Sequence, residues 1–439
     1  MFKETSKELL DFLSKSPTAF HAVENYRQIL NADGFKELLE SEHWDIVPGG
    51  KYYVTRNNTS ILAFKVGTKL DNYSFNIVTS HTDSPTFKVK ENAEIEVKNK
   101  YTQLNTEGYG GMLCATWLDR PLSIAGRVLV SEGNSIVTKL LNIDRDLLMI
   151  PNVAIHMNRA ANDGFKYNLQ VDMLPLLSGG DDRQKDFKQI IADELGVKKE
   201  DILGHDLYLY NRMAPSIWGA NEEFISSGHL DDLQCGFASL KALLAGYNDE
   251  SIDIMACFDN EEVGSGTKQG ADSTLLRDTL IRINNALGKT EEDYHRALAS
   301  SFMLSADNAH AVHPNHPEHT DVTNCTYMNE GVVVKSHAGQ KYTSDGVSMA
   351  VVKSLASGAD VPLQYFANRS DKAGGSTLGN IAMAQASMNA VDIGLPQLAM
   401  HSSYETAGIK DTYYAISLMK ALFDSHIQET STHSLEIKS

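Results

Sequence analysis

The sequence is short of cysteine, of long apolar runs and of basic charge. Its 439 residues include only four cysteines, which lie far apart without the paired spacing of a metal-binding motif. A chain of this length does not need disulfides for stability, so we expect a reducing, cytoplasmic setting. No apolar run approaches the roughly 20 residues that cross a bilayer. The start, MFKETSKELLDFLSKS, predicts an amphipathic helix rather than a signal peptide or membrane anchor.

The charge balance excludes whole classes of partner. The chain carries 57 acidic and 39 basic residues, which gives a formal net charge of −18. This charge repels phosphate backbones and anionic lipid surfaces, so we expect neither nucleic acid nor a membrane as a partner. The hydrophobic share of 42% is ordinary for a globular protein, and the length favours two domains, with one possibly interrupting the other.

The order of predicted elements indicates an α/β protein with an insertion. Residues 1–89 read as helices followed by strands such as KYYVTR and SILAFKV, and residues 219–439 return to alternating strands and helices. Residues 90–218 are β-rich, with one helical stretch in DDRQKDFKQIIADELG. We therefore predict an α/β domain of residues 1–89 and 219–439, interrupted by a β-rich domain of residues 90–218. The tail, QETSTHSLEIKS, is expected to fray.

Histidines and acidic residues stand at or just beyond the ends of four predicted strands. They are His81, the pair Glu261 and Glu262, Asp307, and His401. Ligand crevices of open α/β sheets form at the carboxyl ends of strands. Such side chains are rarely buried unless they are paired or bind metal, so packing alone does not explain this pattern. A shared metal site explains all of them.

Charge balance points to two divalent ions. Two carboxylates about 4 Å apart repel by roughly 4 kcal/mol at an effective dielectric near 20. Asp231, Glu262 and Asp307 supply three negative charges, which two zinc ions would balance with one positive charge left to hold a hydroxide. Nitrogen and carboxylate ligands without thiolate suit Zn²⁺, with Co²⁺ or Mn²⁺ as substitutes.

Two further carboxylates suggest hydrolysis rather than binding alone. Asp83 follows His81 by two residues, where a short turn lets it orient the imidazole or a neighbouring ligand. Glu261 and Glu262 cannot face the same side of a regular strand, so the chain must leave the sheet there. One of them can bind metal while the other acts as a general base on a water whose pKa the metal lowers to about 7.

Each residue alone has a simpler explanation, and two decoys compete. His81 and His401 could be structural histidines, Asp231 a helix cap, Asp307 an Asx turn, and the glutamate pair a solvated loop. The histidines His310, His313, His316 and His319 would form a rival metal site, but their Pro-rich setting favours a solvated loop. The segment GSGTKQG resembles a dinucleotide fingerprint, but its spacing is one residue too long. The rival functions are nicotinamide-dependent redox chemistry and a non-catalytic scaffold.

Several segments occur in the order of a known family. SHTDSP, YGGMLCATWLDRPLSIAGRV, IPNVAIHMNR, HLDDLQC, FDNEEVGS, SADNAHAVHPN and QLAMHS span most of the chain. With these segments the chain resembles aspartyl aminopeptidases and their bacterial relatives, zinc exopeptidases that form tetrahedral dodecamers. The resemblance implies a mixed-sheet catalytic domain with helices on both faces, interrupted by a β-rich oligomerisation domain. It also implies short peptides as substrates and a homo-oligomer of dodecameric form.

The resemblance also assigns roles. It makes Asp231 the carboxylate that bridges both zinc ions, with His81 and Asp307 on one ion and Glu262 and His401 on the other. Glu261 becomes the general base and Asp83 the orienting carboxylate. The implied reaction is attack of a zinc-bridging hydroxide on the first peptide carbonyl.

For substrate binding, the resemblance points to four further residues. Lys335 and Tyr342 would recognise the substrate side chain, and a lysine there favours acidic first residues; by its position alone, Lys335 would be a surface residue at a strand end. Gly375 lies in the loop KAGGST, which would line the pocket, and His156 would reach the site of a neighbouring subunit. The chain departs from many relatives at Asp232, where they have asparagine, and in the loop DKAGGST, so the preferred first residue stays open.

Overall fold

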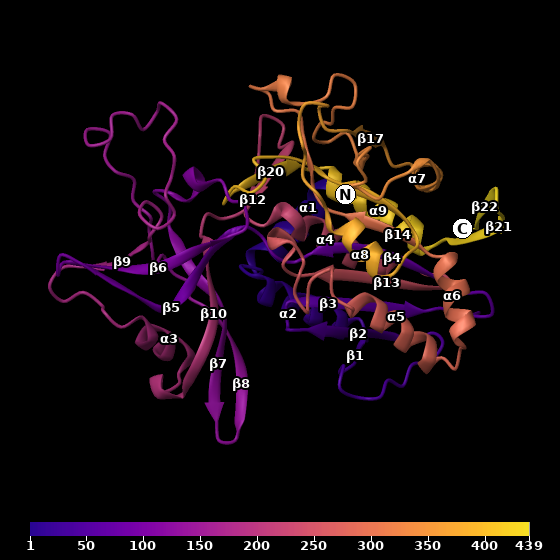
Figure 1. The fold of residues 1–439 in the computed structure, drawn as a ribbon, viewed down its shortest axis with the longest axis horizontal. Helices are drawn as coiled ribbons and strands as arrows, with labels where there is room; N and C mark the ends of the chain where they lie inside the picture. The colour runs from indigo at the N-terminus through magenta and orange to yellow at the C-terminus, as the bar shows by residue number, and fades with distance from the viewer. Residues whose placement is uncertain (439) are drawn as a thin grey trace.

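Residues 1–438 are described by a computed structural model, whose largest element is a nine-stranded mixed sheet (Figure 1). Its strands, in spatial order, are β1 (Lys36–Glu37), β2 (Lys51–Arg56), β3 (Ser60–Val66), β13 (Ser251–Phe258), β4 (Ser74–His81), β14 (Phe302–Ala306), β18 (Asn389–Gly394), β16 (Val332–Lys335) and β17 (Leu363–Phe366). The central strands β13, β4, β14 and β18 run parallel to one another. Strands β4 and β13 are buried along their whole length, as expected of strands that are covered on both faces of a sheet.

Helices cover both faces of this sheet, as predicted. One face packs against α1 (Phe2–Ser14), α2 (Ala19–Ala32), α4 (Leu230–Ala245), α7 (Gly346–Gly358) and α9 (Asp411–Phe423), and the other against α5 (Leu275–Ala286), α6 (Glu291–Ala299) and α8 (Leu378–Gln385). Along β3, Ile61 and Ala63 enter the first core, whereas Leu62 and Phe64 enter the second. This alternation follows from the two-residue period of a strand.

A second sheet of six antiparallel strands forms the arm at the left of Figure 1. Its order is β8 (Ser135–Asn142), β7 (Leu122–Glu132), β10 (Ile202–Asn211), β5 (Thr86–Val97), β6 (Tyr101–Tyr109) and β9 (Leu176–Gly179). Helix α3 (Phe187–Leu195) packs into the core of this arm, and short 3₁₀ turns lie at η1 (Cys114–Trp117) and η2 (Lys199–Asp201). The domain boundaries at residues 90 and 218 stay predictions.

A third sheet of five short strands lies beside the main one. It consists of β11 (Ser216–Trp218), β12 (Phe224–Ser227), β20 (Glu405–Gly408), β19 (Pro396–Leu398) and β15 (Ala309–His310). The expectation of a frayed tail is wrong, because β21 (His426–Ser431) and β22 (Ser434–Lys438) pair as a hairpin. Ile427 packs into the main core and Leu435 and Ile437 lie against it, which holds the hairpin to the body.

The register of the main sheet brings three strand ends to one edge. In the parallel pair of β13 and β4, Phe258 lies opposite His81, and β14 runs parallel to β4 on its other side. Loops that follow these strands therefore emerge side by side. Among residues 1–438, no helix combines the length and apolar character needed to cross a membrane.

Candidate metal centre

The predicted ligands come from five separate segments that meet at this edge. His81 ends β4, Asp307 follows β14, and Glu262 lies in the 3₁₀ turn η3 (Glu261–Val263) shortly after β13. Asp231 is the second residue of α4, where its backbone is still non-helical. His401 comes from the turn between β19 and β20, so it belongs to the five-stranded sheet rather than to the main one.

Asp231 lies at the middle of the cluster. Ligand atoms of His81, Asp231 and Glu262 all lie within 4.8 Å of one another, and so do those of Asp231, Asp232 and Asp307. The shared member of the two groups is Asp231. A carboxylate in this position can offer one oxygen to each of two neighbouring ions.

The distances around Asp231 fit coordination better than hydrogen bonding. Its Oδ1 lies 3.5 Å from His81 Nε2, and its Oδ2 lies 3.5 Å from His401 Nε2. His401 Nε2 is also 3.3 Å from Glu262 Oε2. Ligands bound tetrahedrally at about 2.0–2.1 Å from zinc stand roughly 3.3–3.4 Å apart. The spacing therefore matches atoms that share an ion.

Both histidines are held so that Nε2 faces the carboxylates. His81 Nδ1 lies 3.0 Å from the carbonyl oxygen of Asp83, and His401 Nδ1 lies 2.9 Å from that of Gly111. A carbonyl oxygen can only accept, so each Nδ1 carries the hydrogen and donates it. In the neutral ring, Nε2 then offers a lone pair toward the carboxylate oxygens. Such a contact is repulsive unless a cation or a proton lies between the atoms.

Buried oxygens in the centre also lack partners. Asp231 Oδ1, Asp232 Oδ1 and Glu262 Oε1 are buried and accept no hydrogen bond within the part of the chain that the structure describes. A buried carboxylate oxygen without a partner is costly, and metal coordination relieves that cost. The donor set of histidine nitrogen and carboxylate oxygen, without thiolate, fits zinc.

The pKa shifts of the centre in the absence of a cation also favour a metal site. Burial raises the pKa of Glu262 well above its ordinary value, with the charge of Asp231 adding to the effect. Burial acts to lower the pKa of His81, but contacts with Asp231 and Asp83 outweigh it and raise that pKa. Burial also raises the pKa of Glu261 to about 8. In the metal-free protein, protons thus offset part of the negative charge, and a divalent cation would displace them.

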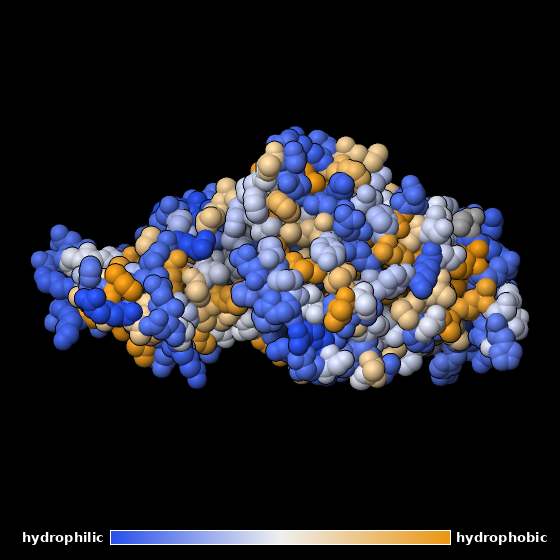
Figure 2. Space-filling model, turned by 90° about the horizontal axis from the view of Figure 1, so that it is seen from above, coloured by the Kyte–Doolittle hydropathy of each residue, from blue (hydrophilic) through white to orange (hydrophobic). Residues whose placement is uncertain are grey.

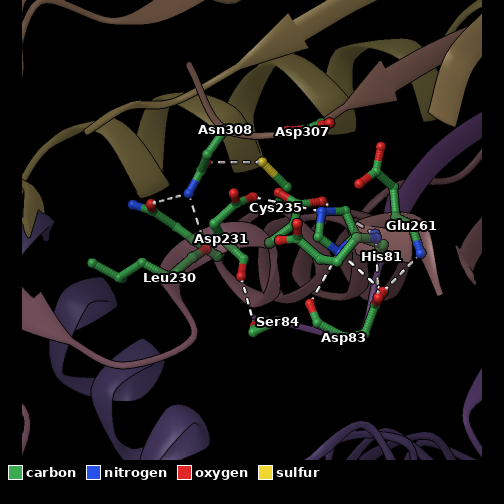
Figure 3. A network of polar contacts seen from close by, with 12 residues as sticks. His81, Asp83, Ser84, Leu230, Asp231, Cys235, Glu261, Asp307 and Asn308 are labelled. Carbon is green, nitrogen blue, oxygen red and sulfur yellow. Dashed lines mark hydrogen bonds and ion pairs between the residues drawn. The ribbon is translucent and has the colours of Figure 1, made fainter. Parts of the chain in front are cut away.

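Asp83 anchors the turn that carries the two glutamates. Its Oδ1 and Oδ2 accept the backbone N–H groups of Glu261 and Glu262, each at 3.1 Å, and Tyr109 donates its hydroxyl to Oδ2 at 2.7 Å. Its Oδ1 also lies 3.3 Å from His81 Nδ1. In Figure 3 no dashed contact reaches the carboxylate of Glu261, although its backbone is tied to Asp83. The side chain of Glu261 is therefore free to exchange a proton.

The sequence did not predict three residues that contact the ligands or Asp83 in this centre. Glu405 is buried and accepts the backbone N–H groups of Asp231 at 3.0 Å and of His401 at 2.8 Å. Tyr109 reaches Asp83 from the β-rich arm. Asp232 is buried and accepts the backbone N–H of His81 at 3.2 Å. Only Glu405 left a usable signal, as an acidic residue four positions after His401.

The predicted substrate residues lie in three different places. Lys335 is 3% exposed, which contradicts a surface position, and its Nζ donates to the carbonyl of Asn308 at 2.9 Å and lies 3.5 Å from Asp307 Oδ1. Tyr342 is buried, and the centroid of its ring lies 5.7 Å from that Nζ. Gly375 and His156 are exposed on loops, outside this cluster. Their predicted roles stay predictions.

The segment GSGTKQG does not form the strand-to-helix turn that binds a dinucleotide. Gly264 ends η3 in a left-handed conformation, and α5 does not begin until Leu275. The carbonyl of Gln269 accepts the backbone N–H of Asp259 and the hydroxyl of Ser60. The segment is therefore a loop held against the sheet rather than a helix start that receives a pyrophosphate.

Comparison with known proteins agrees with this geometry. Residues 12–423 match the family described as Aminopeptidase I zinc metalloprotease (M18). The chain is 48% identical over 425 residues to a protein of Clostridium novyi named probable M18 family aminopeptidase 2, covering 95% of this chain and 98% of the relative. It superposes on the structure of an Ape4 and Nbr1 complex with a TM-score of 0.93 at 35% identity, covering 96% of this chain and 86% of the other.

A dodecamer is among the similar structures. The mApe1 dodecamer of S. cerevisiae gives a TM-score of 0.84 at 28% identity, with 96% of this chain and 97% of that chain covered. The mixed α/β fold predicted from the sequence is confirmed by these likenesses. The chain belongs to the M18 family of zinc metallo-aminopeptidases.

Proposed function

We propose that this aminopeptidase removes the first residue of short peptides with two zinc ions per chain, and that it prefers an acidic first residue. The observation that carries the proposal is Asp231, whose two carboxylate oxygens each face the Nε2 atom of a different histidine. One half of the centre consists of His81 and Asp307, and the other of His401 and Glu262. We call these the buried half and the open half.

Zinc at this centre would polarise the first peptide carbonyl and activate a water molecule. The protein groups hold and move protons around that chemistry. Glu261 accepts the proton of the attacking water on its free carboxylate and delivers it to the leaving amine. Asp83 fixes the backbone of Glu261 through the N–H contact at 3.1 Å, so the base stays next to the reacting atoms. Nδ1–H donation to backbone carbonyls keeps both histidines in the ligand tautomer.

An acidic preference is supported by a lysine that contacts one of the ligands. Lys335 lies 3.5 Å from Asp307, and its side chain is held there by contacts with Asp307, Asn308 and Tyr342. Burial acts to lower the pKa of Lys335, but the charge of Asp307 outweighs it, so the net pKa is raised. A lasting positive charge beside the centre favours a substrate carboxylate over a neutral side chain.

Assembly into a homo-oligomer, a dodecamer as in mApe1, is part of the proposal. The arm exposes large apolar residues on loops between its strands, among them Val153, Ile155, Met157 and Val171. Figure 2 shows apolar side chains among hydrophilic ones on the arm at the left. Such residues favour burial against another subunit. His156 lies in the same loop, and in the proposed assembly it reaches the centre of a neighbouring subunit. A cytoplasmic location is also part of the proposal and agrees with the four free cysteines.

The test is a panel of amino-acid amides hydrolysed with and without a chelator. Activity should vanish on chelation and return with Zn²⁺, Co²⁺ or Mn²⁺, and aspartyl and glutamyl amides should be the best substrates. Glu261→Gln should retain its zinc while kcat falls by about 10²–10⁴, since an amide cannot take the proton. The neighbouring Glu262→Gln is the matched control and should lose zinc instead. Full turnover in Glu261→Gln would overturn the mechanism.

A further inference from the structure

A second cluster of metal-binding side chains lies outside the centre, in the histidine-rich loop. Ligand atoms of His316, Glu318 and His319 all lie within 4.8 Å of one another, and all three residues are exposed. His316 precedes the 3₁₀ turn η4 (Pro317–His319), and His319 ends it. Residues three apart in such a turn lie one above the other, which places both imidazoles on one side.

The loop holds the backbone of these residues in place and brings two imidazole rings together before any ion binds. The rings of His316 and His319 stack with centroids 5.4 Å apart and planes at 27°. The hydroxyl of Thr320 donates to the carbonyl of Pro317 at 2.7 Å, and Arg369 donates to the carbonyl of Glu318. Because the backbone of the turn is already held, binding has to order only the exposed side chains.

The surrounding charges favour a cation. His316 Nδ1 lies 3.1 Å from Glu318 Oε1, so the carboxylate either orients this imidazole or binds beside it. The charge of Arg369 is offset by Asp371, whose two oxygens each accept a guanidinium N–H at 2.9 Å. The ring of His313 packs at a tilt against that of His316, but its Nδ1 accepts the backbone N–H of Asn315, so it supports the cluster without joining it.

We propose that His316, Glu318 and His319 form an accessory site for a divalent transition-metal ion, separate from the catalytic centre. Two imidazoles and one carboxylate select Zn²⁺, Ni²⁺ or Cu²⁺ over Ca²⁺ and Mg²⁺, which require more oxygen ligands. The site shares no residue with the centre around Asp231, so it does not depend on the proposed peptidase mechanism.

Equilibrium dialysis of the full chain against excess Zn²⁺, with the bound metal counted by mass spectrometry, tests the site. The double variant His316→Ala/His319→Ala should bind about one ion per chain fewer than the wild type. Its hydrolysis of amino-acid amides should be unchanged. The matched control, His43→Ala/His433→Ala, removes two other exposed histidines and should bind as many ions as the wild type.

A second variant and a competing ion complete the test. Glu318→Gln should keep the fold and raise the zinc dissociation constant of this site, because one charged ligand is lost. Excess Ca²⁺ should not displace the additional zinc. The proposal is overturned by equal zinc binding in the wild type and both variants, by an equal loss in the control, or by displacement with Ca²⁺.

Discussion

The two halves of the proposed metal centre differ in the burial of their histidines and in the charges beside them. The side chain of His81, in the buried half, is 1% exposed, whereas that of His401, in the open half, is 31% exposed. Lys335 lies against Asp307 in the buried half, and the open half has no such lysine among the described residues. The buried half grows from the ends of β4 and β14, but His401 comes from a turn of a smaller sheet.

This contrast suggests that the two halves serve different roles. Groups at the ends of central strands are held by the whole core, so the buried half is part of what keeps the sheet edge folded. The open half depends on a turn and on η3, and water reaches its histidine more easily. We therefore expect the ion of the open half to exchange first, while the buried half governs stability and the recognition of charge.

Replacing each histidine in turn gives the largest expected effect. His81→Ala and His401→Ala should both abolish turnover, since each removes a ligand. In the chelated protein, His81→Ala should lower the free energy of unfolding by about 2–4 kcal/mol, because it leaves a cavity and an unpaired carbonyl. His401→Ala should change it by less than about 1 kcal/mol. Urea unfolding of both metal-free variants measures this difference, and equal losses would remove the distinction between the halves.

Lys335→Ala probes the charge that distinguishes the buried half. The ratio of kcat/KM for aspartyl over leucyl amides should fall about 10- to 100-fold, the value of a charge-assisted hydrogen bond of about 1.5–3 kcal/mol. Lys65→Ala is the matched control, because Lys65 is also buried and donates to the carbonyls of Leu244 and Gly246. The control should lose stability and keep its preference. Tighter zinc binding with unchanged preference would assign Lys335 to charge balance alone.

Glu405→Gln tests the residue that supports Asp231 together with the open half. A glutamine has only one acceptor oxygen for the two N–H groups of Asp231 and His401, so both ligands lose support. Zinc affinity should fall about 10- to 100-fold, as for other groups that support metal ligands. Asp411→Asn is the matched control, because Asp411 also accepts two backbone N–H groups, from Asn329 and Gly331. If both variants bind zinc equally well, Glu405 only stabilises the fold.

The spacing of apolar residues correctly predicted those elements whose secondary structure depends mainly on their own residues. KYYVTR and SILAFKV alternate or continue in apolar residues, and they coincide with β2 and β3. The spacing of apolar residues in IAMAQASMNA predicts a helix over the whole segment, but α8 ends at Gln385 and β18 begins at Asn389. Small apolar residues fit either a helix or a strand. Here the chain forms a strand, because β18 fills the place in the sheet between β14 and β16.

The same distinction applies to the site: residues placed by a local pattern could be predicted, and residues placed by distant contacts could not. Strand ends placed His81 and Asp307, since parallel strands bring such residues to one edge. Contacts between segments far apart in the chain have no local pattern, so the partner Tyr109 could not be predicted, and the only signal of Glu405 was its position four residues after His401. Lys335 was expected at the surface because a strand end is usually exposed, and only the packed structure puts it against Asp307.

Tyr109→Phe should have the smallest effect and tests whether the arm supports both halves. Tyr109, at the end of β6, donates to Asp83 at 2.7 Å and accepts from Asn260 at 2.8 Å. Asp83 in turn contacts His81 of the buried half and the backbone of Glu262 in the open half. Loss of one hydrogen bond, about 1 kcal/mol net, should lower kcat about three- to tenfold with little change in KM.

The matched control for this last change is Tyr208→Phe. Tyr208 lies on β10 of the same arm and packs edge-on against Tyr109, with ring centroids 5.7 Å apart. Its replacement changes the same surroundings without removing a contact to Asp83, so kcat should stay at the wild-type value. Equal losses in both variants would mean that the tyrosines only pack the arm. A loss confined to Tyr109→Phe, at unchanged stability, would mean that Asp83 transmits the position of the arm to both halves of the centre.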